Sequence, residues 1–353
     1  MSLDEFRSRI NNLDNQILLL LNQRAEAALK IGDLKRHGGA PVYSPEREAE
    51  VLRRVFEANP GPLTGEMARA VWREILSACR ALEAPLTVAF LAPLATFGHQ
   101  AALQRFGESA VYRPSRSNVE IFDEVERGHA QYGVVPVENS TEGAVNVTLD
   151  RLIESDVLIC GEGYLTISQH LLSHARELRD VKTVLSHPQG LAQCRAWLAQ
   201  HMPDVPTQEF SSTAGAAEQA AGDPSLAAIA SDLAGELYGV PVLRPRIEDN
   251  PHNATRFLVV GRTPTATTGR DKTSILFAMR NEPGALYRIL EPLARAGINL
   301  TKIESRPAKR RPWEYVMFVD FEGHRTTSAV TAALAELEAR ALFLRVLGSY
   351  PAA

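Results

Sequence analysis

The apolar positions of the first 35 residues follow one helical stripe. Leu3, Phe6, Ile10, Leu13, Ile17 and Leu20 are spaced alternately by three and four residues, and the stripe resumes at Ala27, Ile31 and Leu34. At about 1.5 Å per residue, about 33 such residues form a helix about 50 Å long. The short helices predicted next cannot cover this length, so we expect the stripe to pack against a second copy of the chain.

Arg24 occupies the next position of this stripe. Burying an unpaired guanidinium costs several kcal/mol, so Arg24 is expected to meet an anion. Lys35 lies about 20° away around the helix and points the same way, whereas Arg7 lies about 100° off that face. Arg7 would therefore serve the same pocket more easily from a partner chain. The alternative is that Arg24 only extends to water.

Two further helices are predicted before residue 85. Ser44 is a typical N-cap followed by proline, and Glu48 shares the apolar stripe of the second helix. The third helix, over about 63–83, has an inward stripe that includes Cys79 and has Glu83 at its edge. The inward or edge-facing charged residues are Arg24, Lys35, Arg47, Glu48 and Glu83. Such a set suggests a small polyanionic ligand with hydroxyl or ether oxygens, although charged helix edges are often only solvated.

The middle segment alternates short apolar runs with helical patterns, which predicts an α/β domain with a parallel sheet. Ligands of such folds lie at the loops after the strands. Polar loops are expected at 138–143, 186–189, 211–213 and 253–256. The loop at 211–213 opens an Ala-rich helix and is a natural anion site, although each loop could instead be an ordinary cap or turn.

The C-terminal segment, after a Thr- and Gly-containing linker at 263–270, has the order strand, helix, strand, strand, helix, strand. This order predicts a ferredoxin-like unit. The segment contains no obvious nucleophile, base or metal cluster, but the start of its first helix could bind a carboxylate.

The composition limits the expected cellular location of the protein and the classes of molecule that it binds. The 353 residues, 45% of them hydrophobic, suggest two or three globular domains. A net charge of −4 argues against nucleic acid and against a polybasic membrane patch. Three widely spaced cysteines without a CxxC motif predict no disulfide framework and no zinc site, and they fit a reducing, cytoplasmic location. The sequence shows no signal peptide and no membrane-spanning stretch.

Residues 3–83 resemble the all-helical chorismate mutases in the pattern R-x16-R-x10-K-x11-R-E. The resemblance implies a domain-swapped dimer in which Arg7 and Arg24 clamp the two carboxylates of chorismate. It assigns to Lys35 a hydrogen bond to the ether oxygen, whose bond breaks as prephenate forms. Glu48 would hold the ring hydroxyl. The implied mutase site comprises Arg7, Arg24, Lys35, Ser44, Arg47, Glu48, Cys79 and Glu83.

Two positions depart from the best-known bacterial pattern. Ser44 stands where an acidic residue is expected, and it can still hydrogen-bond a hydroxyl. Glu83 aligns with a second donor to the ether oxygen. An ionised carboxylate only accepts hydrogen bonds, so Glu83 must be protonated to take this catalytic role.

The stretches VPVENSTEGAVNVTLD, SHPQGLAQCRAWL, FSSTAGAAEQA and NATRF resemble prephenate dehydratase. The resemblance implies two subdomains around a cleft, similar to a periplasmic binding protein, and conversion of prephenate to phenylpyruvate with loss of water and CO2. Because an aromatic ring forms, no cofactor is required. The resemblance assigns Thr255 the acid or proton-positioning role. Asn139, Ser140, Thr141, Ser212, Thr213 and Arg256 are expected to line the site.

Two assignments in this segment have alternative explanations, and one loop departs from the family pattern. Arg256 could instead be a structural salt-bridge partner. His99 and His187 are possible neighbours of the site, but a lone histidine is more often structural. The loop at 92–98 lacks two glycines that the family usually has, with Ala92 and Ala95 in their places, and this restricts its backbone.

The C-terminal segment resembles an ACT regulatory domain of the phenylalanine-sensing type. Its GAL motif contains Gly284, Ala285 and Leu286, and its ESRP motif contains Glu304, Ser305, Arg306 and Pro307. The resemblance implies phenylalanine binding at a dimer interface and feedback inhibition. A purely structural dimerisation module is the alternative.

The sequence thus predicts a multidomain, cytoplasmic bifunctional enzyme of phenylalanine biosynthesis. We expect an all-α mutase domain (1–85), an α/β dehydratase domain of two subdomains (86–262) and an α+β ferredoxin-like ACT domain (271–353). Chorismate and prephenate are the expected substrates, L-phenylalanine the allosteric ligand and a homodimer the minimal assembly, with no metal or cofactor. Alternatives are a chain with only dehydratase activity, a non-catalytic amino-acid sensor and a dehydratase that prefers arogenate.

Overall fold

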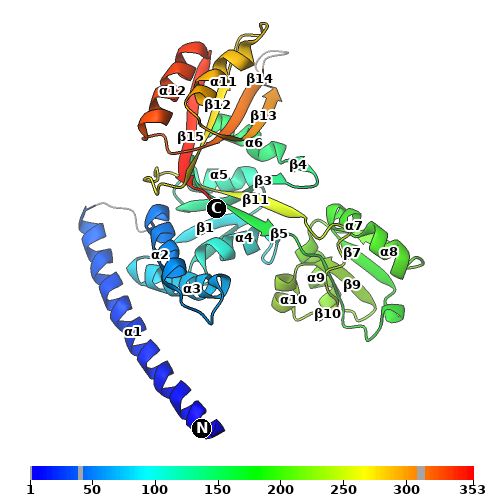
Figure 1. Ribbon diagram of the computed structural model, residues 1–353. Helices are drawn as coiled ribbons and strands as arrows, with labels where there is room; N and C mark the ends of the chain where they lie inside the picture. The colour runs from blue at the N-terminus through cyan, green and yellow to red at the C-terminus, as the bar shows by residue number, and fades with distance from the viewer. Residues whose placement is uncertain (1, 39–42, 308–314) are drawn as a thin grey trace. The chain divides into compact units, whose positions relative to one another are not determined.

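The computed structural model describes residues 2–38, 43–307 and 315–353 (Figure 1). The chain divides into two compact units. One contains the N-terminal helices together with Arg105–Val111, and the other contains Val88–Gln104 and Tyr112–Ala353. Each unit is described by itself.

The first unit is built on three helices, α1 (Leu3–Gly38), α2 (Pro45–Ala58) and α3 (Gly65–Glu83). The Ser44 hydroxyl caps α2 as predicted, accepting a hydrogen bond from the Arg47 backbone N–H at 3.3 Å. Helix α1 continues through Gly32, where a Cβ would lie 3.1 Å from the Glu83 Cα. The absence of a side chain at Gly32 therefore lets α1 approach the end of α3 closely.

The apolar stripe of α1 is solvent-exposed in the single chain. Its first six members are each 46–66% exposed: Leu3, Phe6, Ile10, Leu13, Ile17 and Leu20. A contiguous exposed apolar surface of this kind marks an interaction site.

The described part of the second unit contains three sheets, and the first two belong to the two subdomains of its middle segment. The first has the strand order β2-β1-β3-β11-β5, with β4 paired to β3. Its strands are β1 (Thr87–Leu91), β2 (Val111–Ser115), β3 (Tyr132–Asn139), β4 (Gly143–Ala144), β5 (Leu158–Thr166) and β11 (Ala254–Gly261). The second sheet has the order β10-β6-β9-β7-β8. Its strands are β6 (His170–Leu172), β7 (Thr183–Ser186), β8 (Thr207–Glu209), β9 (Leu226–Ala230) and β10 (Val242–Arg244).

The sheets are mixed, not parallel throughout as the alternation of elements suggested. Strand β1 is parallel to β3, but β11 runs antiparallel to both β3 and β5. The reason is connectivity: the chain leaves the first sheet after β5, builds the second subdomain and returns along β11. The helices of this region are α4 (Phe97–Phe106), α5 (Asn118–Glu126), α6 (Asn146–Glu154), α7 (Pro188–Gln193), α8 (Arg195–His201), α9 (Thr213–Ala221) and α10 (Asp232–Tyr238), with a 3-10 turn at Leu178–Asp180.

The C-terminal part has the predicted strand and helix order. It consists of β12 (Asp271–Ala278), α11 (Ala285–Arg295), β13 (Leu300–Pro307), β14 (Tyr315–Glu322), α12 (Ser328–Arg340) and β15 (Phe343–Pro351). The sheet order is β13-β14-β12-β15, and Figure 1 shows α11 and α12 together on one side of it. Their core residues include Ile289, Leu293 and Leu337.

The opposite face of this C-terminal sheet shares a hydrophobic core with the first sheet of the same unit. Leu276, Phe318 and Tyr350 pack in one cluster with Val135 and Leu149. Strand β15 also approaches β5 so closely that a Cβ at Gly348 would collide with the Ile159 carbonyl. The two sheets therefore form a continuous packed structure.

Candidate active sites and regulatory site

In the first unit, the end of α1 and the end of α3 bring Lys35 and Glu83 together. The Lys35 Nζ donates to the Glu83 Oε2 at 2.9 Å. The Glu83 side chain is only 10% exposed and that of Lys35 is 25% exposed. Two residues that the sequence placed on inward or edge positions of separate helices thus meet in space, and the close contact at Gly32 permits it.

Glu48 points inward as predicted, and its carboxylate already has protein partners. Arg80 forms an ion pair with it, and the Tyr43 hydroxyl donates to its Oε1 at 3.4 Å. The Arg80 guanidinium also lies over the Tyr43 ring, 5.0 Å from its centroid, and donates to the Phe106 carbonyl at 2.5 Å. Burial raises the pKa of the Tyr43 phenol, so the phenol stays neutral and can donate.

Arg80 and Tyr43 were not among the predicted site residues. Arg80 lies one turn after Leu76, so its place on the inward face of α3 was available from the helical spacing. Tyr43 precedes the cap of α2 and carries no periodic signal.

The other predicted mutase residues do not join this cluster within one chain. Arg7 is 68% exposed and lies 3.5 Å from Asp4, and Arg47 pairs with Glu50 at 2.6 Å on the surface. Arg24 is half-buried and Cys79 is buried. Arg7 and Lys35 belong to the same continuous helix, about 42 Å apart at 1.5 Å per residue, so they cannot line one pocket of one chain.

In the second unit, Asn139 and Thr255 face each other across β3 and β11, where they are register partners. The Asn139 Nδ2 donates to the Thr255 Oγ1 at 2.9 Å, and both residues are nearly buried. The Asn139 Oδ1 accepts from the backbone N–H and the hydroxyl of Thr141, at 3.0 and 2.6 Å, which fixes the orientation of the amide.

This orientation leaves a proton on Thr255. Its oxygen accepts from Asn139, and among the described residues its own O–H donates to no side chain. A hydroxyl has one donor in addition to its acceptor sites, so the Thr255 proton is available for a ligand oxygen.

Asn253 completes the cluster. Its Oδ1 accepts from Asn139 Nδ2 at 2.9 Å and lies within hydrogen-bond distance of the Thr141 and Ser140 hydroxyls, at 3.0 and 3.4 Å. Its Nδ2 is buried and has no hydrogen-bond partner in the part of the chain that the structure describes. A buried donor left unpaired costs about 1–3 kcal/mol, so Asn253 is a candidate to donate to a bound ligand. We did not predict it as a site residue, although it lies in the NATRF motif.

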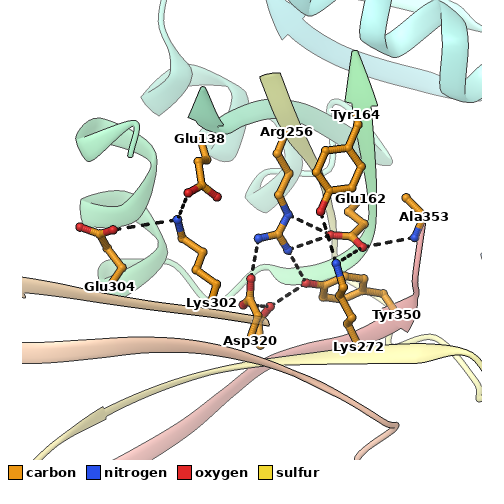
Figure 2. A network of polar contacts seen from close by, with 11 residues as sticks. Glu138, Glu162, Tyr164, Arg256, Lys272, Lys302, Glu304, Asp320, Tyr350 and Ala353 are labelled. Carbon is orange, nitrogen blue, oxygen red and sulfur yellow. Dashed lines mark hydrogen bonds and ion pairs between the residues drawn. The ribbon is translucent and has the colours of Figure 1, made fainter. Parts of the chain in front are cut away.

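Arg256 does not line this cluster, because successive strand residues point to opposite faces. Its Nε donates to the Glu162 Oε2 at 2.9 Å and its Nη1 lies 2.5 Å from the Asp320 Oδ2 (Figure 2). The expectation that Arg256 contacts substrate therefore gives way to the alternative, a structural ion-pair partner.

Comparison with known proteins covers nearly the whole chain. The profiles of the families described as "Chorismate mutase type II", "Prephenate dehydratase" and "ACT domain" match residues 6–84, 88–265 and 273–339. A bifunctional chorismate mutase/prephenate dehydratase of Aquifex aeolicus is 48% identical over 99% of this chain and 98% of its own length.

The chain belongs to the bifunctional chorismate mutase/prephenate dehydratases. The expected enzyme activities and the expected family are thereby confirmed. We refer below to the mutase, dehydratase and ACT domains.

Two solved structures resemble the dehydratase and ACT domains. A prephenate dehydratase of Arthrobacter aurescens in complex with L-Phe is 36% identical, with a TM-score of 0.70, and covers 76% of this chain and 90% of its own. GqqA, described as a novel type of quorum-quenching acylase, is 30% identical, with a TM-score of 0.69, and covers 76% of this chain and 98% of its own. One fold thus carries differently named activities, so the assignment to this family rests on the full-length relatives.

The second subdomain of the dehydratase domain contributes helix N-termini. The Ser212 hydroxyl caps α9 by accepting from the Gly215 N–H at 2.9 Å, and Thr213 is the first helical residue. His187 caps α7, its Nδ1 accepting from the Gln189 N–H at 3.2 Å. Because these groups are engaged in capping, His187 has a structural role in this geometry.

His99 also has a structural role. Its Nδ1 accepts a hydrogen bond from the Ala95 N–H at 3.1 Å, and its ring stacks on Phe90 with centroids 4.5 Å apart. Burial lowers the pKa of His99, which favours the neutral ring that this hydrogen bond requires. Ala95 has a φ of 60°, in the left-handed region that the expected glycine would adopt freely.

In the ACT domain, one predicted sensing motif lies at the start of α11 and the other lies on β13. Gly284, with a φ of 74°, caps α11, and Ala285 lines a cavity of about 510 Å³ together with Arg288 and Leu342. Along β13 the exposure alternates, so Ser305 and Pro307 are exposed. Glu304 and Arg306 point the other way.

The Arg306 side chain binds residues of the dehydratase domain. Its Nη2 lies 2.9 Å from the Asp150 Oδ1 and its Nη1 donates to the Asn146 Oδ1 at 2.7 Å. In this geometry Arg306 connects β13 to α6, which differs from the expected direct contact with phenylalanine.

Searches of the described residues find no group of three or more potential metal ligands and no helix long and apolar enough to cross a membrane.

Proposed function

We propose that this chain converts chorismate to prephenate in the mutase domain and prephenate to phenylpyruvate in the dehydratase domain, under feedback inhibition by L-phenylalanine. The observation that carries the proposal is the cluster of Asn139, Asn253 and Thr255, which offers two unused donors, together with full-length similarity to bifunctional enzymes. We also propose a homodimer and a cytoplasmic location. The exposed stripe of α1 and three buried free cysteines support these two points.

For the mutase, Lys35 supplies the hydrogen bond to the ether oxygen of chorismate. An ammonium carries three donors and is cationic, so it can stabilise the negative charge that develops on the ether oxygen, and the contact with Glu83 holds it in place. Arg24 of the same chain and Arg7 of a second copy hold the two carboxylates of chorismate. No bond to the protein forms, since a pericyclic rearrangement needs only a compact conformer and stabilised developing charge.

Glu48 keeps capacity for the ring hydroxyl. Arg80 binds its Oε2, and among the described residues its Oε1 accepts the long 3.4 Å contact from Tyr43. A carboxylate oxygen has two lone pairs, so the Oε1 can accept from the substrate as well.

For the dehydratase, Thr255 donates its free proton to the departing ring hydroxyl. Asn139 holds the threonine oxygen as an acceptor and so directs the O–H away from itself. The departing hydroxyl takes up a proton that is relayed from solvent through the Thr255 hydroxyl and leaves as water, the carboxylate on the same ring leaves as CO2, and the electron pair of the broken C–C bond completes the aromatic ring. A threonine hydroxyl is a very weak acid, so it acts through a strong hydrogen bond or a relay and does not release its proton outright.

Asn253 would hold a substrate oxygen beside Thr255. Its buried Nδ2 donor suits a carboxylate, whose charge strengthens the hydrogen bond. This gives the site one group for orientation and one for the departing hydroxyl.

Phenylalanine would bind the ACT domain at Gly284, Ala285 and Leu286 of one copy and at Glu304, Ser305 and Pro307 of β13. The L-Phe in the Arthrobacter relative supports this ligand. Inhibition requires that phenylalanine bind one state of the enzyme better than another.

The test is a product assay from chorismate, with and without millimolar phenylalanine. We expect phenylpyruvate, suppressed by phenylalanine. Untouched chorismate with conversion of added prephenate would make the helical domain structural, and tight prephenate binding without turnover would indicate a non-catalytic sensor. Faster turnover of arogenate than of prephenate would change the substrate.

A further inference from the structure

The two residues next to the Asn139–Thr255 pair also face each other. Glu138 and Arg256 are register partners on β3 and β11, one residue from the pair in each strand. Since strand residues alternate, their side chains point to the face opposite the substrate-binding cluster. That face is the one against which the ACT sheet packs.

The ACT sheet presents two charges in matching positions. Lys302 on β13 and Asp320 on β14 are register partners. The Lys302 Nζ lies 2.8 Å from the Glu138 Oε1, and the Asp320 Oδ2 lies 2.5 Å from the Arg256 Nη1. Figure 2 shows both ion pairs side by side, each joining one strand of the dehydratase pair to one strand of the ACT pair. We call Glu138, Arg256, Lys302 and Asp320 the charge bridge.

The Arg256 half of the charge bridge is buried and fully partnered. The Asp320 Oδ1 accepts from the Ser274 hydroxyl at 2.6 Å, and the Arg256 Nη2 donates to the Tyr350 hydroxyl at 3.1 Å. Glu162, whose side chain is fully buried, receives Arg256 on one oxygen and Lys272 on the other, the latter at 2.7 Å. Buried ion networks stabilise a fold less than apolar packing does. Their best-documented roles are to fix the register of packed elements and to act as a switch between two states.

In the other half of the charge bridge, Lys302 has two carboxylates within ion-pair distance. Glu304, one of the residues proposed to bind phenylalanine, lies 3.9 Å from the Lys302 Nζ on the same face of β13. Lys302 is thus shared between Glu138 of the dehydratase strand and Glu304 of the sensing motif. A ligand that engages Glu304 or shifts β13 alters the hold of Lys302 on Glu138.

We propose that Glu138 and Arg256 are positioning residues for the Asn139–Thr255 pair, and that the charge bridge transmits phenylalanine binding from the ACT domain to the dehydratase site. This inference rests on the proposed feedback by phenylalanine. A shift of β3 or β11 that follows the loss of one of these ion pairs would change the 2.9 Å contact that directs the Thr255 proton.

The experiment compares K302M and D320N with the parent full-length chain. K302M keeps the apolar stem and leaves Glu138, whose side chain is 39% exposed, to be solvated, so folding is preserved. R345M is the matched control, because Arg345 donates to the Leu152 carbonyl of the dehydratase domain without touching β3 or β11. Chorismate consumption by the mutase domain of the same molecules reports folding and active concentration.

Each chain is assayed for phenylalanine binding by calorimetry and for dehydratase kcat and KM with and without phenylalanine. We expect all variants to bind phenylalanine. In the parent and in R345M, phenylalanine should change dehydratase kcat/KM by about 5–150-fold, the usual range of allosteric coupling, and in K302M and D320N this factor should fall towards 1. The single variants E138K and K302E should also lose this coupling, and the double variant E138K/K302E, in which the two charges are exchanged, should restore part of it.

The outcomes separate the two claims. If the parent neither binds phenylalanine nor is inhibited by it, the proposed feedback fails and the transmission claim fails with it. If the parent is inhibited and K302M and D320N are inhibited equally well, the feedback stands and the charge bridge is refuted. If R345M loses coupling as fully as K302M, the effect belongs to domain contact in general, which also refutes the charge bridge.

Discussion

Replacing Thr255 by valine removes the proposed proton donor and keeps the shape of the side chain. The structure limits the cost in stability. The Asn139 Nδ2 keeps the Asn253 Oδ1 at 2.9 Å, but the N–H that pointed at Thr255 loses its acceptor, so the domain should lose about 1–3 kcal/mol. The Thr255 side chain is nearly buried, and the added methyl takes the place of the hydroxyl, so no cavity forms.

The cost in catalysis should be larger. Loss of a group that donates to the departing hydroxyl is expected to lower dehydratase kcat by about 10²–10⁴-fold. This corresponds to about 2.7–5.4 kcal/mol at 1.36 kcal/mol per tenfold change. The difference between the two costs makes T255V informative, because unfolding cannot account for a loss of this size.

The assay follows phenylpyruvate formation from prephenate, and T255S is the matched variant that keeps the hydroxyl. The mutase activity of the same molecules serves as an internal standard for folded protein. T255S should retain most of the activity. A loss in T255V smaller than about tenfold, with unchanged mutase activity, would show that the Thr255 hydroxyl is not the donor.

Three further predictions concern other parts of the chain. If Arg7 serves the pocket of a second copy, then R7A and K35A should each lack mutase activity. An equal mixture of the two variants, after subunit exchange, should regain about one quarter of the parent activity, because half the dimers are mixed and each mixed dimer has one intact site of two. A mixture that stays inactive would argue against the shared site. If the Glu83 carboxyl must donate to the ether oxygen, E83Q, whose amide always carries donors, should raise the rate of chorismate consumption, whereas an unchanged rate would remove Glu83 from the mechanism. Burial lowers the pKa of His99, so the unfolded chain binds the proton more readily and the stabilisation present above about pH 6.5 should be lost as the pH falls. The melting temperature of the dehydratase domain should therefore decline between pH 7 and 5, less so in H99Q; equal slopes would contradict this.

Local signals were sufficient for most of the helices and for the order of the ACT domain. Ser44 and the following proline mark the start of α2 by chemistry that acts within one turn, and the structure has the cap as predicted. Strand β2 was missed because it is an edge strand with mostly exposed residues and a proline, so it lacks an apolar run.

The partners of a charged side chain are harder to predict. Strand alternation alone separates Arg256 from Thr255, and this could have been applied to the sequence. The main partner across the domains, Asp320, is 64 residues further along the chain, and only the packing of the ACT sheet brings it near. The same holds for Arg80 and Glu48, which lie on different helices.

The substitution of Ala95 for the glycine expected in the 92–98 loop also has an explanation in packing. An alanine at a φ of 60° costs about 1–2 kcal/mol in the left-handed region. Its methyl group, however, is 1% exposed and belongs to the core of the second subdomain, with Leu172 and Ala214. Burial of one such group contributes about 0.8 kcal/mol, and alanine loses about 0.4–1 kcal/mol less conformational entropy on folding than glycine.

These terms nearly offset each other, so the loop keeps its conformation without glycine. The backbone of Ala95 is held at both ends: its N–H donates to His99, and its carbonyl accepts from the Ser231 hydroxyl at 3.2 Å. Ser231 belongs to the second subdomain, at the start of α10. The loop therefore connects the two halves of the dehydratase domain through one buried methyl and one hydrogen bond. For this reason alanine in place of glycine at position 95 is compatible with the folded loop.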